Sequence, residues 1–416
     1  MLTTIFHRAI LFLRQLYVRV LLIAALSLVS VALAKLLAPV IPPGLAQAIG
    51  ADAVDPILTT LANSMLAVTI FSLTMMVSAH QAAASQWSPR THVILTDDMT
   101  TQSVLATFVG AYLFSLCALI LRRTDFFGER ESVALFLMTI LVVAMIVVAI
   151  IRWIAHLEDL GSLSHTADAV QSRAETAVAS VGRHPCYGAR ALEDDPARVT
   201  DGSARVIGAP CAGYVQQIFA DMLQSTAEAA DARVYVTVST GQYVAEGAPL
   251  AHVAGGGKDI VTKLRDAFAI ANARSFVQDP RFGVSVMAEI ASRALSPGIN
   301  DPVTAVDIAN RLATVLMLAD PGRETEDGKP DLDRVWMPRF RYDGLFLDSY
   351  DRIARDAGAN AEVQIAVQLG LASVIRESGP ELAEAARACG ARTLARARAA
   401  MKDDPDLPRL NAAASV

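Results

Sequence analysis

The chain has 416 residues, of which 53% are hydrophobic and 19% charged, and its formal net charge is -6 at pH 7. This length allows two or three domains. The acidic balance excludes nucleic acid as an expected partner, because binding the phosphate backbone needs clustered Lys and Arg side chains that the sequence does not assemble.

Four apolar segments near the N-terminus are long enough to cross a bilayer, and no such segment follows them. Only the first contains a charged residue, Lys35. It is longer than the apolar region of a signal peptide, so we expect it to be retained. At about 1.5 Å rise per residue, all four match the roughly 30 Å of a hydrocarbon core. The sequence therefore predicts a transmembrane domain over residues 1–151, embedded in the lipid bilayer. The four spans cover residues 20–41, 57–79, 104–121 and 132–151.

Basic residues beside the spans predict the orientation. The loop 38–56 has no Lys or Arg, whereas three arginines precede the first span: Arg8, Arg14 and Arg19. This bias places the N-terminus in the cytoplasm, although three arginines in the third connection point the other way. The four cysteines are scattered and form no CxxC pair, as in a reducing compartment. We expect a multi-pass protein of the bacterial cytoplasmic (inner) membrane with both termini in the cytoplasm.

The remaining chain changes its hydrophobic period several times. Residues 152–203 are expected to form a helical connector and a loop. Residues 204–255 show β-branched and aromatic runs between glycines, which predicts a small β module. Residues 260–401 have apolar positions at three- and four-residue spacing, which predicts a helical cytoplasmic domain, with a short hairpin over 335–347. Residues 402–416 are expected to be a flexible tail. The fold class expected is an α-helical membrane domain with four transmembrane helices plus a cytoplasmic α+β domain.

A regular spacing of glycines and apolar residues marks the β module. Gly241, Val244, Gly247 and Leu250 form a G-x-x-V-x-x-G-x-x-L pattern, which resembles the half-motif of biotinyl/lipoyl-like barrel-sandwich domains. Those carrier domains present a modifiable lysine after Asp or Met at a hairpin tip, and this region contains no such pair. We therefore expect a barrel-sandwich-like module without a covalent cofactor.

A short polar loop is the sharpest local signal in the helical domain. Asp301 is placed to cap a helix that starts at Pro302, so a structural corner is a complete explanation. The loop also gathers polar groups at a helix N-terminus, and a ligand or interdomain contact is the second interpretation. The residues concerned are Ser296, Pro297, Gly298, Asn300, Asp301 and Pro302.

Four motifs spread along the chain resemble a bacterial family of predicted multi-pass membrane proteins that is known only as a domain of unknown function. The resemblance extends over nearly the whole chain. It implies four spans and a cytoplasmic domain, and it implies no reaction. Relatives tend to show paired histidines after the fourth span, whereas Ala155 precedes His156 here. The motifs are Ser85–Arg90, Trp153–His156, Ala212–Val215 and Arg293–Ala305.

Polar residues follow one face of the second span. Thr74, Ser78, Gln81 and Ser85 recur at intervals of four, three and four, and Asn63 extends this line through Ile70. Hydrogen bonds between helices are one explanation. The other is the lining of a polar pathway, with Ile70 near a dry constriction.

The end of the fourth span carries an interfacial group of side chains. Trp153 is expected at the headgroup level. His156 and Asp159 lie three residues apart on a helix and could bind a cation together, but a solvated interfacial face is the simpler explanation, so we expect no metal. The sequence has no G-x-S-x-G or H-E-x-x-H motif, and we expect no enzyme.

These observations favour a homo-oligomer that forms a pore for an ion or small solute, gated by its cytoplasmic domain. Four spans are few to enclose a pathway, so a ring with the second span innermost would supply the walls. The alternative is a non-conducting membrane scaffold or sensor that recruits a partner through the cytoplasmic domain. A pore requires the polar face to converge on an axis, whereas a scaffold requires it to be buried against the other spans of the same chain.

Overall fold

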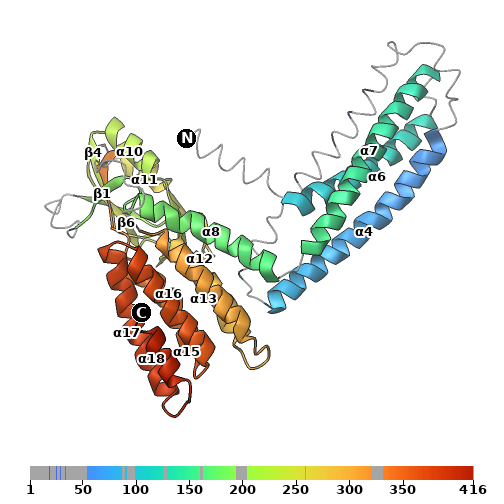
Figure 1. The fold of residues 1–416 in the computed structure, drawn as a ribbon. Helices are drawn as coiled ribbons and strands as arrows, with labels where there is room; N and C mark the ends of the chain where they lie inside the picture. The colour runs from blue at the N-terminus through green and yellow to red at the C-terminus, as the bar shows by residue number, and fades with distance from the viewer. Residues whose placement is uncertain are drawn as a thin grey trace. The chain divides into compact units, whose positions relative to one another are not determined.

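A computed structural model of the chain describes residues 54–86, 90, 99–124, 129–159, 163–193, 204–257, 259–320 and 331–415, together with Val18, Ala25, Val29 and Leu33. The chain divides into two compact units, Met1–Thr166 and Ala167–Val416, and each is described by itself. Figure 1 shows the long apolar helices of the first unit in blue and teal and the sheets and helices of the second in green to red.

Three long helices make up the described part of the first unit. Each contains a stretch that is long and apolar enough to cross a membrane, which confirms the second, third and fourth predicted spans as candidates. The first predicted span, 20–41, lies outside the described residues except for Ala25, Val29 and Leu33. The helices are α4 (Val54–Gln86), α6 (Met99–Arg122) and α7 (Glu129–Asp159), and the stretches are Val54–Ala79, Thr100–Arg122 and Glu131–Leu157.

Side chains from all three helices bury two apolar clusters in this unit. One contains Leu58, Phe114 and Leu135, and the other surrounds Phe108 and Trp153. The outward side of α7 is also apolar. Its exposed residues between Leu137 and Ile151 are Leu, Ile, Ala, Met and Val only. Such a surface suits lipid, where apolar side chains cost nothing and backbone groups are satisfied within each helix.

Two sheets form the β part of the second unit. The larger has the strand order β1-β8-β4-β6-β2, and the smaller has the order β5-β3-β7. In the larger sheet β8 runs parallel to both β1 and β4, whereas β6 is antiparallel to β2 and β4. The strands are β1 (Ala189–Ala191), β2 (Arg205–Gly208), β3 (Gly213–Ile218), β4 (Ala232–Val236), β5 (Tyr243–Val244), β6 (Pro249–Gly255), β7 (Phe268–Ala271) and β8 (Leu332–Met337).

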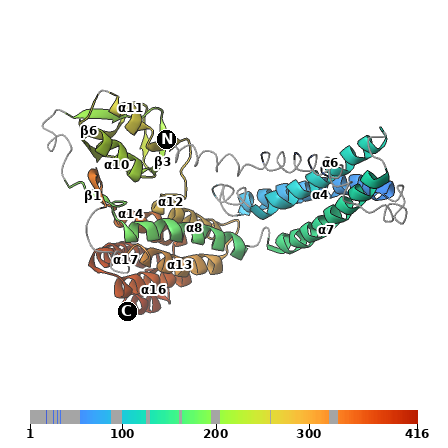
Figure 2. The same cartoon turned by 90° about the horizontal axis from the view of Figure 1, so that it is seen from above.

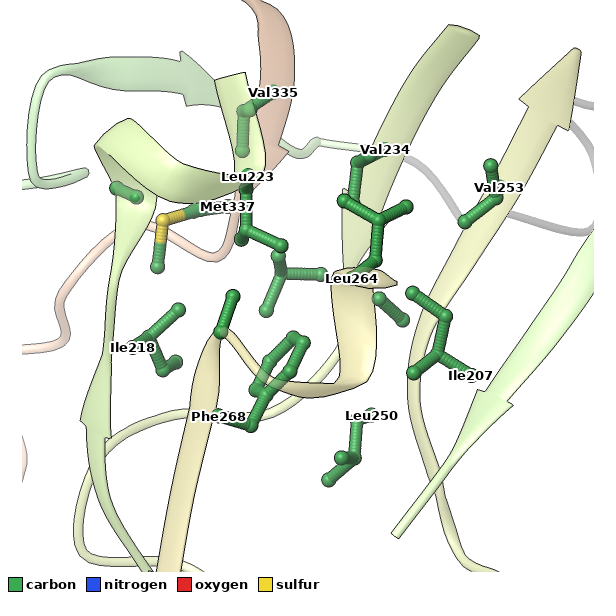
Figure 3. Close-up of a cluster of buried hydrophobic side chains, with 14 of the residues drawn as sticks. Ile207, Ile218, Leu223, Val234, Leu250, Val253, Leu264, Phe268, Val335 and Met337 are labelled. Carbon is green, nitrogen blue, oxygen red and sulfur yellow. The ribbon is translucent and has the colours of Figure 1, made fainter. Parts of the chain in front are cut away.

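One hydrophobic core joins the two sheets to two short helices. Figure 3 shows Leu223 of α10 (Ala220–Ala229) and Leu264 of α11 (Ile260–Arg265) among side chains from both sheets, including Ile207 and Phe268. Leu223, Leu264 and Ile207 are fully buried. Burial of each such side chain contributes roughly 1.5–3 kcal/mol. This core therefore fixes how the strands are arranged.

The glycine pattern of the β module is confirmed, but the boundaries predicted for the module were wrong. Gly241 and Gly247 have positive φ angles of 80° and 77°, and Val244 and Leu250 are buried. The sheets, however, also use β1, β7 and β8, which lie outside 204–255. A local period of two cannot show that a distant strand pairs in parallel, because parallel pairing needs a long crossover.

Two further predictions for the C-terminal part were wrong. Residues 335–347 do not form a hairpin, since β8 ends at Met337 in the main sheet and α14 (Asp343–Asp348) follows. The tail contains a helix, α18 (Leu407–Ala413), whose Leu410 is buried against Ala397 and Met401. Pro408 lies in the first turn of α18, where a missing N–H costs nothing, so the prolines did not mark a flexible end.

Helices complete the second unit. Helix α8 (Leu163–Arg183) crosses α12, and a Cβ on Gly283 would lie 2.7 Å from Ala174, so the two helices approach closely. Figures 1 and 2 show α16 beside α13 and α17. Tyr350, fully buried, donates a hydrogen bond to the Ala309 carbonyl at 2.7 Å. The helices are α12 (Pro280–Ala294), α13 (Pro302–Met317), α15 (Tyr350–Ala357), α16 (Ala361–Glu377) and α17 (Pro380–Ala400).

A partly buried ion pair connects the β part to α12. Arg274 donates from Nε to Oδ2 of Asp279 at 2.8 Å and from an NH2 group to Oδ1 at 2.9 Å. Asp279 is 1% exposed and also accepts from the backbone N–H of Phe282, so it caps α12. The turn at Gly241 lies directly against this carboxylate.

We predict that Gly241→Ala destabilises the protein far more than Gly247→Ala. Both glycines have a left-handed φ, which costs an L-residue roughly 1–2 kcal/mol. A Cβ at Gly241 would also lie 2.2 Å from Oδ2 of Asp279, whereas a Cβ at Gly247 meets nothing within 4 Å. Displacing the buried Asp279 carboxylate from its partners should add a further cost of roughly 1–3 kcal/mol. Thermal unfolding of the full chain in detergent measures both variants, and equal losses would contradict this account of the turn.

Candidate functional site

The polar stripe of α4, consisting of Asn63, Ile70, Thr74, Ser78 and Gln81, is exposed along its whole described length. The side chain of Ser85, predicted as its last member, lies outside the described residues. The opposite face of α4 supplies the buried contacts to α6 and α7. The other described spans therefore do not cover the stripe.

The stripe also lacks side-chain hydrogen-bond partners on α6 and α7. Thr74 donates from its hydroxyl to the Ile70 carbonyl of its own helix at 2.9 Å. The side chains of Asn63, Ser78 and Gln81 form no hydrogen bond with another residue in the described part of the chain. Each such group placed against hydrocarbon costs roughly 0.5–2 kcal/mol. Asn63 and Ser78 lie within the candidate membrane stretch Val54–Ala79, and α6 and α7 provide no polar partner for their side chains.

One end of the three helices is closed by a charged network. Arg122, at the end of α6, forms an ion pair with Asp55 at the start of α4 and donates to the Ser132 hydroxyl of α7 at 2.8 Å. The Arg122 side chain is 11% exposed. Sequence reasoning used Arg122 only for orientation and missed this contact. The available signal was an Asp just before one apolar segment and an Arg just after the next, because antiparallel helices bring these positions to the same end.

The opposite end of the bundle contains the predicted interfacial residues. His156 shares a hydrogen bond with the Thr101 hydroxyl, with 3.0 Å between Nε2 and Oγ1, so it joins α7 to α6. Trp153 is buried in the apolar cluster, and its ring centre lies 5.9 Å from that of His156. The side chain of Asp159 lies outside the described residues, so its predicted pairing with His156 stays a prediction.

The loop between α12 and α13 has the geometry of the predicted structural corner. The Ser296 hydroxyl donates to the Arg293 carbonyl at 2.6 Å, and Asn300 has a left-handed φ of 53°. Asp301 accepts from the backbone N–H and the hydroxyl of Thr304, and these bonds lower the pKa of its carboxyl group. Pro302 then begins α13. Ser296 and Asp301 thus have structural tasks in this corner.

The tip of the same loop is exposed. Pro297, Gly298 and Asn300 face solvent, and the apolar side chains of Ile299 and Val303 are 43% and 71% exposed. Contact of this tip with a ligand or another domain stays a prediction. Exposed apolar side chains at a rigid corner suit a protein surface better than a small ligand.

We predict that Arg122→Ala lowers the melting temperature of the solubilised protein and that Arg123→Ala does not. Arg122 joins the three helices, whereas the neighbouring Arg123 is exposed. The substitution leaves Asp55 and Ser132 without this partner and should lower the free energy of unfolding by roughly 1–3 kcal/mol. A thermal shift assay in detergent compares the pair, and identical melting curves would show that the network does not hold the helices together.

Comparison with known proteins agrees with a membrane location. The family model described as "Predicted membrane protein (DUF2254)" matches residues 13–373. Uncharacterised proteins of Mycobacterium bovis and Mycobacterium tuberculosis are each 29% identical over 259 residues, which are 59% of this chain and 48% of theirs. The chain thus spans about half the length of these curated relatives. No solved structure matches, so the barrel-sandwich likeness stays a prediction. The chain belongs to the DUF2254 family of predicted membrane proteins.

Proposed function

We propose that the protein assembles as a homo-oligomer in which the polar stripe of α4 lines a path for an ion or a small solute. One observation carries the proposal: the stripe is exposed, and neither α6 nor α7 covers it. Copies of the chain arranged around an axis would give these side chains each other and water as partners. This role needs no catalysis.

The contrast between α4 and α7 supports this arrangement. The exposed residues of α7 between Leu137 and Ile151 are all apolar, whereas α4 exposes Asn63 and Ser78 within its candidate stretch Val54–Ala79. Polar side chains are costly on a helix face that contacts lipid, whereas water can hydrogen-bond to them at a water-filled axis. The proposal therefore places α4 innermost and α7 toward lipid.

Ile70 is the proposed constriction. It is 58% exposed and lies one helical turn before Thr74, whose hydroxyl is satisfied by the Ile70 carbonyl. A ring of apolar side chains between polar ones blocks flow by excluding water. This position would close the path without a charged gate.

The proposal also places the second unit in the cytoplasm, where it controls the path. The four cysteines are all free, as suits a reducing compartment. The arginines before the first apolar segment favour the same side.

A non-conducting scaffold is the second candidate, and a separate observation favours it. The corner between α12 and α13 exposes Ile299 and Val303, which are 43% and 71% accessible. Apolar side chains at the end of a helical hairpin are suited to a protein partner. In this case the stripe of α4 would form hydrogen bonds between associating helices and would not line a path for a solute.

We predict that Ile70→Asn raises solute flux and Ser78→Leu lowers it. The first change wets the constriction, and the second narrows the polar lining. Purified protein in liposomes, tested with common cations and anions, measures the flux. Leu141→Asn is the matched control, because Leu141 of α7 is 55% exposed, close to the 58% of Ile70, but faces lipid in the proposed ring. If neither the wild type nor Ile70→Asn shows any flux, the non-conducting scaffold is the better explanation.

We predict that Cys211 is protected from a membrane-impermeant maleimide in intact cells and reacts quickly once the membrane is opened. Cys211 is exposed between β2 and β3. Cys389 cannot serve as the reporter, because it is fully buried and burial raises the pKa of its thiol. Cys211→Ser identifies the labelled site. Rapid labelling of Cys211 in intact cells would put the second unit outside and reverse the topology.

A further inference from the structure

A cavity of about 460 Å³ lies in the second unit, beside the ion pair Arg274–Asp279. Its volume falls within the range of sites for small molecules. Its walls come from the segments 185–187, 238–242, 274–281 and 337–341. The cavity is separate from the stripe of α4, and the inference drawn from it stands whether or not the protein conducts.

The sheet topology creates this cavity. Strands β4 and β8 are parallel neighbours, so the segments that follow them, 238–242 and 337–341, leave the sheet at the same edge. The carboxyl edge of parallel strands is where open sheets with helices bind ligands. Tyr187 holds the wall in shape, since its hydroxyl donates to the Gln278 carbonyl at 3.2 Å and lies 3.3 Å from that of Thr240.

The charges of the lining are strongly unbalanced. Four arginines and one carboxylate, Asp279, line the cavity. Arg274 forms a bidentate ion pair with Asp279, so these two charges cancel. The excess positive charge comes from Arg281, Arg339 and Arg341.

Each of these three arginines has an acidic partner outside the cavity lining. Arg281 pairs with Asp348 at 2.8 Å, Arg339 with Glu381 at 3.1 Å and Arg341 with Asp343 at 3.0 Å. A guanidinium group has five N–H donors, and each of these pairs uses only one or two. Exposed pairs of this kind are weak, so the pairs orient the side chains without preventing a second anion from binding.

We propose that this cavity binds a small anion that carries phosphoryl groups. A planar guanidinium matches the oxygens of a phosphoryl group with two parallel hydrogen bonds. Three such groups, each with N–H donors left over beside its own carboxylate partner, suit an anion that carries several acceptor oxygens. Ser239, Thr240 and Gln242 add neutral polar groups, and Phe340 adds an apolar wall.

Titration calorimetry of the full chain in detergent tests the site with two probes, inorganic pyrophosphate and dihexanoyl phosphatidic acid, at constant ionic strength. We expect saturable binding of at least one probe. Binding of pyrophosphate identifies a soluble ligand, and binding of phosphatidic acid alone identifies a lipid headgroup. Absence of saturable binding of both probes would overturn the proposal.

The double variant Arg281→Gln with Arg339→Gln should weaken binding at least tenfold. Arg376→Gln is the control, because Arg376 is exposed and paired with the adjacent Glu377 but lies outside the cavity. If the double Gln variant does not fold, the double Lys variant keeps the charges and loses the forked geometry, and it should bind more weakly than the wild type. Unchanged affinity in a folded double variant would place the anion elsewhere and refute the site.

Discussion

The organisation of the membrane unit depends on one constraint: polar side chains in a hydrocarbon layer need a polar partner. Helix α4 satisfies its backbone and the Thr74 hydroxyl internally, but Asn63 and Ser78, within its candidate stretch, are exposed and not covered by α6 or α7. Hydrogen bonds at the two ends of the bundle, around Arg122 and His156, hold the three helices so that this face stays outward. Exposure of the stripe is thus a property of the three packed helices, and the proposed assembly of several copies would cover it.

The second unit is organised around a different contact, the ion pair of Arg274 with the buried Asp279. It caps α12, borders the turn at Gly241 and forms one wall of the arginine-lined cavity. A site built beside a fixed ion pair is preorganised, because its walls need not be ordered when a ligand arrives. If the cavity binds a phosphorylated anion and the unit controls a path, the ligand would be a natural signal for that control.

Spans α4, α6 and α7 could be predicted because apolar length is a local property of the sequence. The glycine turns at Gly241 and Gly247 were also local. The position of β8 in the sheet could not be predicted, since its parallel pairing with β4 joins residues about a hundred positions apart. The cavity depends on that pairing. The sequence alone therefore could not show that Arg339, Phe340 and Arg341 line a cavity. For the same reason the link between Arg122 and Asp55 was missed.

The central claim is that α4 faces other copies of the chain, and disulfide cross-linking in native membranes tests it most directly. Ser78→Cys in a background that lacks Cys117 should form cross-linked dimers under mild oxidation, because Ser78 lies on the stripe. Leu141→Cys, on the exposed apolar side of α7, should stay monomeric. Efficient cross-linking through Leu141→Cys with none through Ser78→Cys would contradict the arrangement and assign α7 to the interface.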